Sequence, residues 1–93
     1  MSKPLWWKNA VKLIKDFTTE DSYMTFQRYD NNVMFFYNVR IDGVNVTLDE
    51  MVSIDTLECD RLQGILTTEL HEIFASMIRE YIDDLDYHHI VGM

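Results

Sequence analysis

The sequence predicts an α+β domain built from an N-terminal helix, a three-stranded antiparallel β-meander, a short helical turn and a long C-terminal helix. Apolar and polar residues alternate through the middle of the chain, as in strands, whereas apolar residues recur at helical spacing towards both ends. With 93 residues, 47% of them hydrophobic, the chain can bury one core, so we expect a single domain over residues 1–93.

The first helix is expected over residues 4–17. Pro4 suits the first turn of a helix, where its missing N–H breaks no hydrogen bond. One face is apolar and the opposite face is a stripe of lysines. A basic helix with two tryptophans could also lie on a membrane surface, although aromatic residues at helical spacing are more often part of a core. The tryptophans are Trp6 and Trp7, and the lysines are Lys8, Lys12 and Lys15.

Three strands are predicted to follow, over residues 22–29, 33–41 and 44–48. The first shows alternation, and the second is rich in β-branched and aromatic residues. The polar residues between these two strands tolerate a turn with positive φ. Asp42–Gly43, between the second and third strands, favours a type I′ turn. The sequence therefore predicts a meander with one apolar face for the helices to cover.

A short helical turn is expected over residues 49–53, followed by the long helix beginning near Thr56. Thr47 with Glu50, and Asp55 with Glu58, each have the spacing of an N-terminal capping box. The apolar pattern of the long helix covers residues 57–87. An unbroken helix of this length would extend for about 45 Å, whereas a globular domain of this size has a radius of gyration of about 12 Å. The helix must therefore break, most plausibly near Gly64, or extend beyond the core.

The apolar face of the long helix is wide enough to serve a second partner. Its apolar residues recur every four positions, so the row drifts by about 40° at each step around a helix of 3.6 residues per turn. The two ends of the face thus point in different directions. A homodimer through the later part and a monomer with a kinked helix both stay open. The candidate dimer residues are Phe74, Ile78, Tyr81, Ile82 and Leu85.

Charge is distributed unevenly along the chain. The net charge is −8; residues 1–40 hold six Lys or Arg and four Asp or Glu, a balance of +2, whereas residues 41–93 hold two arginines and twelve carboxylates, a balance of −10. A negative field repels nucleic acid and anionic lipid and attracts basic protein surfaces. We therefore expect neither direct nucleic-acid binding nor membrane binding by the acidic part.

Compartment and chemistry are only weakly indicated. The single cysteine, Cys59, excludes an internal disulfide framework, and no apolar run approaches a membrane span, so we expect a cytoplasmic protein. Cys59 and His71 could serve as a nucleophile and a base, but the sequence indicates no third group that would orient the base. A metal site near the C-terminus lacks a recognisable ligand spacing. We therefore expect no catalytic residues, metal or cofactor. The metal candidates considered are Asp84, Asp86, His88 and His89.

These features favour a small acidic, non-enzymatic inhibitor whose carboxylates imitate the phosphates of a nucleic acid and occupy a basic surface of a nucleic-acid-binding protein. Small proteins of this kind are typical of phages and mobile elements that disarm host defence. The alternative is a dimeric adaptor or assembly protein that uses the apolar face of the long helix. The candidate partner-binding residues are Asp55, Glu58, Asp60, Glu69, Glu72, Glu80, Asp83, Asp84 and Asp86.

Overall fold

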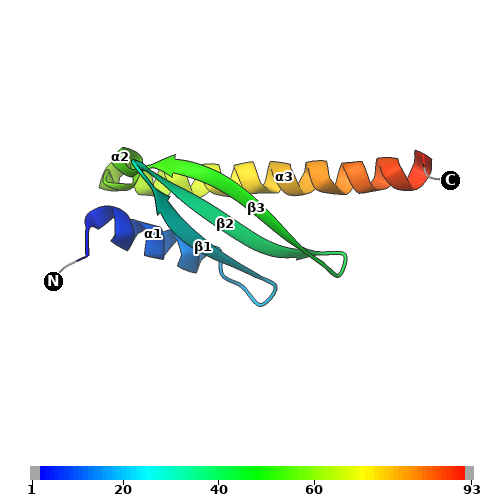
Figure 1. Ribbon diagram of the computed structural model, residues 1–93, viewed down its shortest axis with the longest axis horizontal. Coiled ribbons are helices and arrows are strands. Elements are labelled where there is room, and N and C mark those ends of the chain that lie inside the picture. The colour runs from blue at the N-terminus through cyan, green and yellow to red at the C-terminus, as the bar shows by residue number, and fades with distance from the viewer. Residues whose placement is uncertain (1–2, 92–93) are drawn as a thin grey trace.

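The computed structural model describes the backbone of residues 3–91 and the side-chain surroundings of residues 3–84. Two long helices lie against one face of a three-stranded antiparallel sheet, so the expected α+β architecture is confirmed (Figure 1). The elements are α1 (Leu5–Asp16), β1 (Ser22–Tyr29), β2 (Asn32–Ile41), β3 (Val44–Ser53), α2 (Ile54–Leu57), the 3₁₀ helix η1 (Asp60–Leu62) and α3 (Gln63–Val91).

The sheet is a meander of strand order β1-β2-β3, closed by two-residue turns. Asp42 and Gly43 both have positive φ, at 52° and 80°, as the predicted type I′ turn requires. This turn pairs Ile41 with Val44, and the register continues without a bulge to Asn32 and Ser53. The β2–β3 hairpin is therefore a regular ribbon of ten paired residues on each strand.

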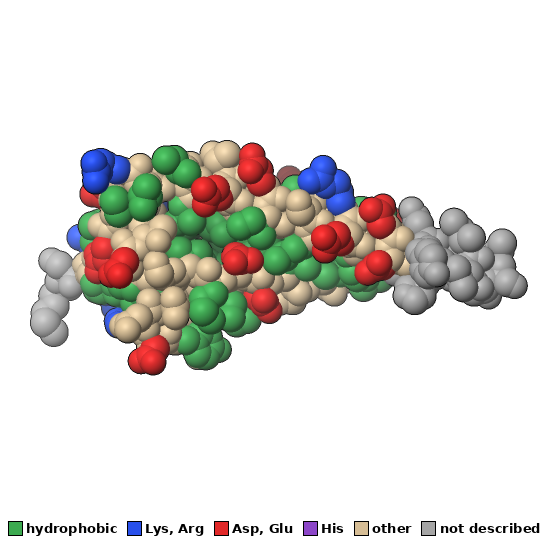
Figure 2. Space-filling model, turned by 90° about the horizontal axis from the view of Figure 1, so that it is seen from above, with side chains coloured by type: hydrophobic (Ala, Val, Ile, Leu, Met, Phe, Trp, Pro, Cys, Tyr) green, Lys and Arg blue, Asp and Glu red, His purple; other side chains and the backbone are tan. Residues whose placement is uncertain are grey.

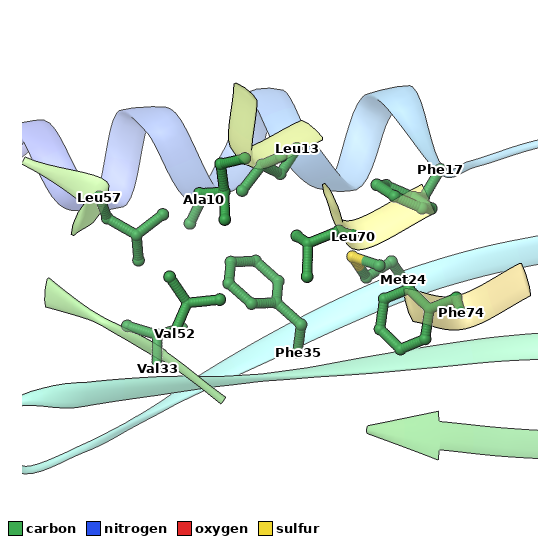
Figure 3. Close-up of a cluster of buried hydrophobic side chains, with 11 residues drawn as sticks. Ala10, Leu13, Phe17, Met24, Val33, Phe35, Val52, Leu57, Leu70 and Phe74 are labelled. Carbon is green, nitrogen blue, oxygen red and sulfur yellow. The ribbon is translucent and has the colours of Figure 1, made fainter. Parts of the chain in front are cut away.

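The core lies between the sheet and the helices (Figure 3). Phe35, at the centre of β2, and Phe74 of α3 are its largest fully buried side chains. Phe17, directly after α1, packs edge-on against Phe74 at 5.8 Å and against Tyr37 at 5.5 Å between ring centroids, which ties the end of α1 to both layers. The remaining core residues are Ala10, Leu13, Met24, Val33, Val52, Leu57, Leu66 and Leu70.

Residues 49–53 belong to β3, so the helical turn expected there was wrong. The two-residue turn at Asp42–Gly43 sets a register in which residues 49–53 lie opposite the first half of β2. Val52 pairs with Val33 and both are buried, which favours the strand over a local turn. Thr47 does not form the expected capping box; its hydroxyl donates to the Asn38 side chain on the neighbouring strand.

The long helix is interrupted before Gly64 rather than at it. Helix α2 ends at Leu57, and Cys59 adopts an extended conformation before η1 and α3 begin. The cap of α2 is Ser53, whose hydroxyl accepts from the Thr56 N–H at 3.2 Å, and not the expected Asp55. Gly64 lies inside α3 as its second residue.

Side chains from elsewhere in the fold stabilise this interruption. Asn9 of α1 is 2% exposed and donates to the Leu57 carbonyl at 2.6 Å. The Gln63 amide donates to the carbonyls of Thr56 and Cys59 at 2.9 and 2.7 Å. These carbonyls would otherwise accept N–H groups of a continuing helix, so their alternative partners allow the chain to turn between α2 and α3.

Helix α3 extends well past the body of the fold (Figure 1). Its 29 residues correspond to about 44 Å, and the molecule measures 58 × 23 × 22 Å. The radius of gyration is 15.4 Å, above the roughly 12 Å of a globular domain of this length. Within residues 3–91, no helix combines the length and apolar character needed to cross a bilayer. The C-terminal part of α3 is therefore a projecting rod.

The two tryptophans of α1 pack on the sheet. Trp6 and Trp7 each meet the Phe26 ring edge-on, at 6.3 and 6.4 Å between centroids. Cations cover both indoles, because the Arg28 guanidinium lies 5.4 Å from the Trp6 ring and the Lys3 ammonium 5.2 Å from that of Trp7. These half-buried rings contribute to the packing of α1 on the sheet.

Candidate protein-binding groove

The carboxylates of α3 gather on one side of the helix. At about 100° per residue, five of them fall within a sector of about 120°, and all five are exposed. We call this set the acidic flank; it consists of Glu69, Glu72, Glu80, Asp83 and Asp84. The buried residues Leu66, Leu70 and Phe74 define the core-facing side of α3. The flank therefore lies beside the core contact, over about 22 Å of helix.

A groove runs along this side of α3, and its first part lies between α3 and β3. Its first part has a volume of about 240 Å³ and is bounded by Glu50, Val52, Leu70 and Glu69 among others. The second part, about 470 Å³, is lined by Glu72, Ile73, Ser76, Met77 and Glu80. Ile73 lines both parts, so they are neighbours along α3, and every residue that lines the second part belongs to this helix. We call the whole the acidic groove, because apolar side chains form its floor and carboxylates its rim.

The molecule viewed from the α3 side shows acidic side chains spread over the surface, with hydrophobic side chains exposed between them (Figure 2). No Lys or Arg side chain is among the residues that line the acidic groove. A partner that enters the groove would therefore meet negative charge around an apolar centre. This combination suits a basic side chain accompanied by an apolar one.

Arg79 is the basic residue of α3 beside the acidic flank, four positions before Asp83, whereas other basic residues lie on other elements. Arg79 donates to the Ser76 hydroxyl at 3.3 Å, and Arg28 donates to the Asp30 carbonyl at 2.8 Å. The lysine stripe of α1, Lys8, Lys12 and Lys15, is exposed to solvent. Among residues 3–84, no hydrogen bond recorded in the structure joins a carboxylate to a lysine or an arginine. The acidic flank therefore places five carboxylates beside one arginine of the same helix, and its net charge is negative.

The other candidate partner-binding residues lie apart from the flank. Asp55 is in α2, Glu58 follows it, and Asp60 begins η1, so all three sit at the opposite end of α3 from Asp83. All three are exposed, and Asp60 accepts a weak hydrogen bond of 3.4 Å from the Asn9 amide. The side chain of Asp86 lies outside the described residues. The structure therefore divides the predicted set between two regions.

The candidate dimer residues occupy the other side of α3. Phe74 is 1% exposed and packs on Phe17 and Tyr37, so its ring is unavailable to a second copy. Ile78 and Tyr81 are half-buried, and Ile82 is 37% exposed. By helical spacing, Ile78 lies about 120° or more from Glu72 and Glu80, whereas Ile82 lies about 160° from Glu80 and about 80° from Glu72. The side chain of Leu85 lies outside the described residues.

His71 and Cys59, the candidate base and nucleophile, each have their own contacts in the fold. His71 stacks on the Phe17 ring at 4.1 Å between centroids. Cys59 is half-buried at the start of η1, where its carbonyl accepts from the Leu62 N–H and the Gln63 amide. Among the described residues, no three His, Cys, Asp or Glu side chains are placed to hold a metal ion. Asp84 is exposed, whereas the side chains of Asp86, His88 and His89 lie outside the described part.

Most residues that line the acidic groove were not among the candidate partner-binding residues, and Glu50, Ile73 and Met77 are three of those that were missed. The expected helical turn over residues 49–53 concealed Glu50. The alternation of Leu48, Glu50 and Val52 is the signal that could have placed it on the helix-facing side of a strand. Ile73 and Met77 lie on the predicted apolar face of α3, and helical spacing places them beside the carboxylates of the same helix.

Comparisons with protein-family models, with curated proteins and with solved structures found no match to this chain.

Proposed function

We propose that this chain is a non-enzymatic binding protein that docks a basic surface of another protein along the acidic groove. The observation that carries the proposal is the acidic flank itself, five exposed carboxylates on one side of a rigid helix. Local helix stability does not account for all of them, because Glu80 and Asp84 form a like-charge pair at i, i+4, which is unfavourable. A partner that neutralises these charges would offset the cost.

The spacing supports imitation of a nucleic acid. From Glu69 to Asp84 the flank covers about 22 Å, which corresponds to roughly six or seven phosphates of one B-DNA strand at about 3.4 Å each. Five carboxylates over that length approach the linear charge of one strand. The target would then be a nucleic-acid-binding protein, and occupation of its basic site would inhibit it. The proposal includes a role for this chain in a phage or mobile element, where it would inhibit a host defence protein.

The test is affinity capture from a cell lysate, followed by competition with a DNA duplex. We expect captured proteins to be released by duplex and by raising the salt from about 50 mM to about 500 mM, because exposed charge pairs are screened over about 10 Å at 0.1 M. Replacing the acidic flank by amides (Glu69→Gln, Glu72→Gln, Glu80→Gln, Asp83→Asn and Asp84→Asn) should abolish this capture.

A control variant removes the same number of charges elsewhere. It carries Asp16→Asn, Glu20→Gln, Asp21→Asn, Asp30→Asn and Asp42→Asn, all at exposed positions outside α3. Capture by the control should match that of the unmodified chain. Equal loss in both variants would attribute capture to net charge alone and would remove the acidic flank from the site.

A second candidate is a dimeric adaptor, and the exposed apolar side of the projecting helix favours it. Ile78, Tyr81 and Ile82 continue the apolar face beyond Phe74, the last fully buried residue of α3 within residues 3–84. Partner binding or dimerisation through this side would be insensitive to salt and lost in Ile82→Lys. The nucleic-acid mimic predicts the reverse, with steep salt dependence and unchanged capture by Ile82→Lys.

A further inference from the structure

The outer edge of β3 carries free backbone hydrogen-bonding groups. The type I′ turn makes Ile41 and Val44 a hydrogen-bonded pair, and such pairs alternate along an antiparallel ribbon. Val44 and every second residue after it therefore bond to β2. The intervening residues, Asn45, Thr47, Asp49 and Met51, direct their N–H and C=O groups away from the sheet. Since β3 is an edge strand, these groups can pair with another strand.

The free edge lies directly beside the first part of the acidic groove. Glu50 and Val52 face the helices, and Met51 and Ser53 also border the groove. Leu66, Leu70 and Ile73 complete an apolar floor. The volume of about 240 Å³ is below the roughly 300 Å³ at which small-molecule pockets begin. This space suits a single apolar side chain projecting from a chain that lies along β3.

The charges at this edge select the occupant. Glu50 and Glu69 both line the groove, and Asp49 lies on the opposite face of the strand. A second copy paired through β3 and centred near Glu50 would place carboxylates on adjacent strands, where like charges destabilise pairing. A basic strand would instead neutralise them. The same carboxylates thus protect the edge from self-association and favour a basic partner.

We propose that the partner contributes an extended segment that adds to the β3 edge as a fourth strand. An apolar side chain of the segment enters the groove, and a lysine or arginine two positions away lies between Glu50 and Glu69, because residues i and i+2 of a strand point to the same face. Backbone bonds to Asp49 and Met51 supply affinity, and the two side chains supply selectivity. This rests on the proposed function, in that the partner is basic, and it specifies the form in which the partner binds.

The test uses the synthetic peptide Thr-Leu-Thr-Arg-Thr-Leu-Thr-Arg. In an extended conformation its leucines and arginines lie on one face and its threonines on the other. We expect amide hydrogen exchange at Asp49 and Met51 to slow at least tenfold when the peptide binds the full chain, because their N–H groups gain acceptors. The same peptide with every backbone nitrogen methylated has no N–H group on either edge, so it cannot pair with β3 and should protect neither amide. Equal protection by both peptides would overturn the proposal.

Two variants address the edge and the rim separately. Met51→Pro removes an N–H that points away from β2, so the sheet is expected to persist while peptide affinity falls at least tenfold. Glu50→Gln with Glu69→Gln should weaken the peptide roughly three- to tenfold, whereas Asp16→Asn with Glu20→Gln, a control of equal charge, should not. If Met51→Pro fails to fold, comparison of the methylated and unmethylated peptides on the unmodified chain still decides whether the peptide adds to β3 as a strand.

The outcomes separate this inference from the proposed function. If the peptide protects neither amide while duplex-sensitive capture still requires the acidic flank, the partner presents a folded basic surface and strand addition is wrong. Protection of Asp49 and Met51 that rises with protein concentration in the absence of peptide would identify a second copy as the occupant and would also overturn the inference. If the peptide binds equally well after methylation of its backbone, after Met51→Pro and after Glu50→Gln with Glu69→Gln, then neither the β3 edge nor the carboxylate rim is its site.

Discussion

At the residue scale, the decisive contacts are made by two side-chain amides, that of Asn9, which is buried, and that of Gln63, which is half-buried. They donate to the carbonyls of Thr56, Leu57 and Cys59, and thereby set where α2 stops and α3 starts. Asn9 is almost completely buried, so its hydrogen bonds form where water cannot replace them. The direction of α3, and with it the position of the acidic flank relative to β3, depends on these bonds.

We expect Asn9→Ala to lower the free energy of unfolding by about 1 to 3 kcal/mol, the usual cost of leaving a buried polar partner unsatisfied. Urea denaturation followed by circular dichroism measures this. Asn45→Ala, at an exposed position on β3, serves as the control and should change stability by less than about 0.5 kcal/mol. Equal effects of the two substitutions would show that the Asn9 bonds contribute nothing specific.

At the element scale, the β2–β3 turn and helix α3 require different backbone conformations of the glycine that each contains. Gly43 has φ of +80° in the type I′ turn, whereas Gly64 lies in the first turn of α3 with helical geometry. An added Cβ would meet no atom within 4 Å at either position. Any difference between them must therefore come from backbone conformation and not from steric contact.

Substitution by alanine should have opposite signs at these two glycines. Gly43→Ala is expected to destabilise the protein by about 1 to 2 kcal/mol, because an L-residue is strained at positive φ. Gly64→Ala should stabilise it by up to about 1 kcal/mol through helix propensity. Thermal unfolding of both variants measures the difference. A stabilising Gly43→Ala would contradict the turn geometry that sets the β3 register.

At the scale of the whole molecule, charge and shape act together. The chain carries a net charge of −8, and α3 projects its carboxylates along a molecule 58 Å long. Mutual repulsion among these groups opposes compaction and is relieved by salt. The free protein should therefore be more stable at higher ionic strength, in contrast to its complex with a basic partner.

Raising sodium chloride from about 20 mM to about 500 mM should increase the melting temperature by a few degrees. The variant with the acidic flank replaced by amides should show a smaller increase, because fewer like charges remain to be screened. Scanning calorimetry at both salt concentrations provides the measurement. An identical salt response in the two proteins would mean that the flank does not repel itself appreciably.

The sequence by itself determined the order of the elements, the Asp42–Gly43 turn and the uneven charge, because these follow from local pattern and composition. It did not determine the length of β3 or the break before α3. Pairing with β2 extends the strand through residues 49–53, and Asn9, 48 positions before Leu57, helps to end α2.

The candidate site was likewise determined partly by the sequence and partly by the tertiary structure. Helical spacing alone places the α3 carboxylates within one sector, since 3.6 residues make a turn. Only the tertiary structure brings Glu50 to the same groove as Glu69 and leaves the β3 edge open beside them. Those relations join residues far apart in the chain, and they depend on how β3 crosses α3 when both bury their apolar faces in one core.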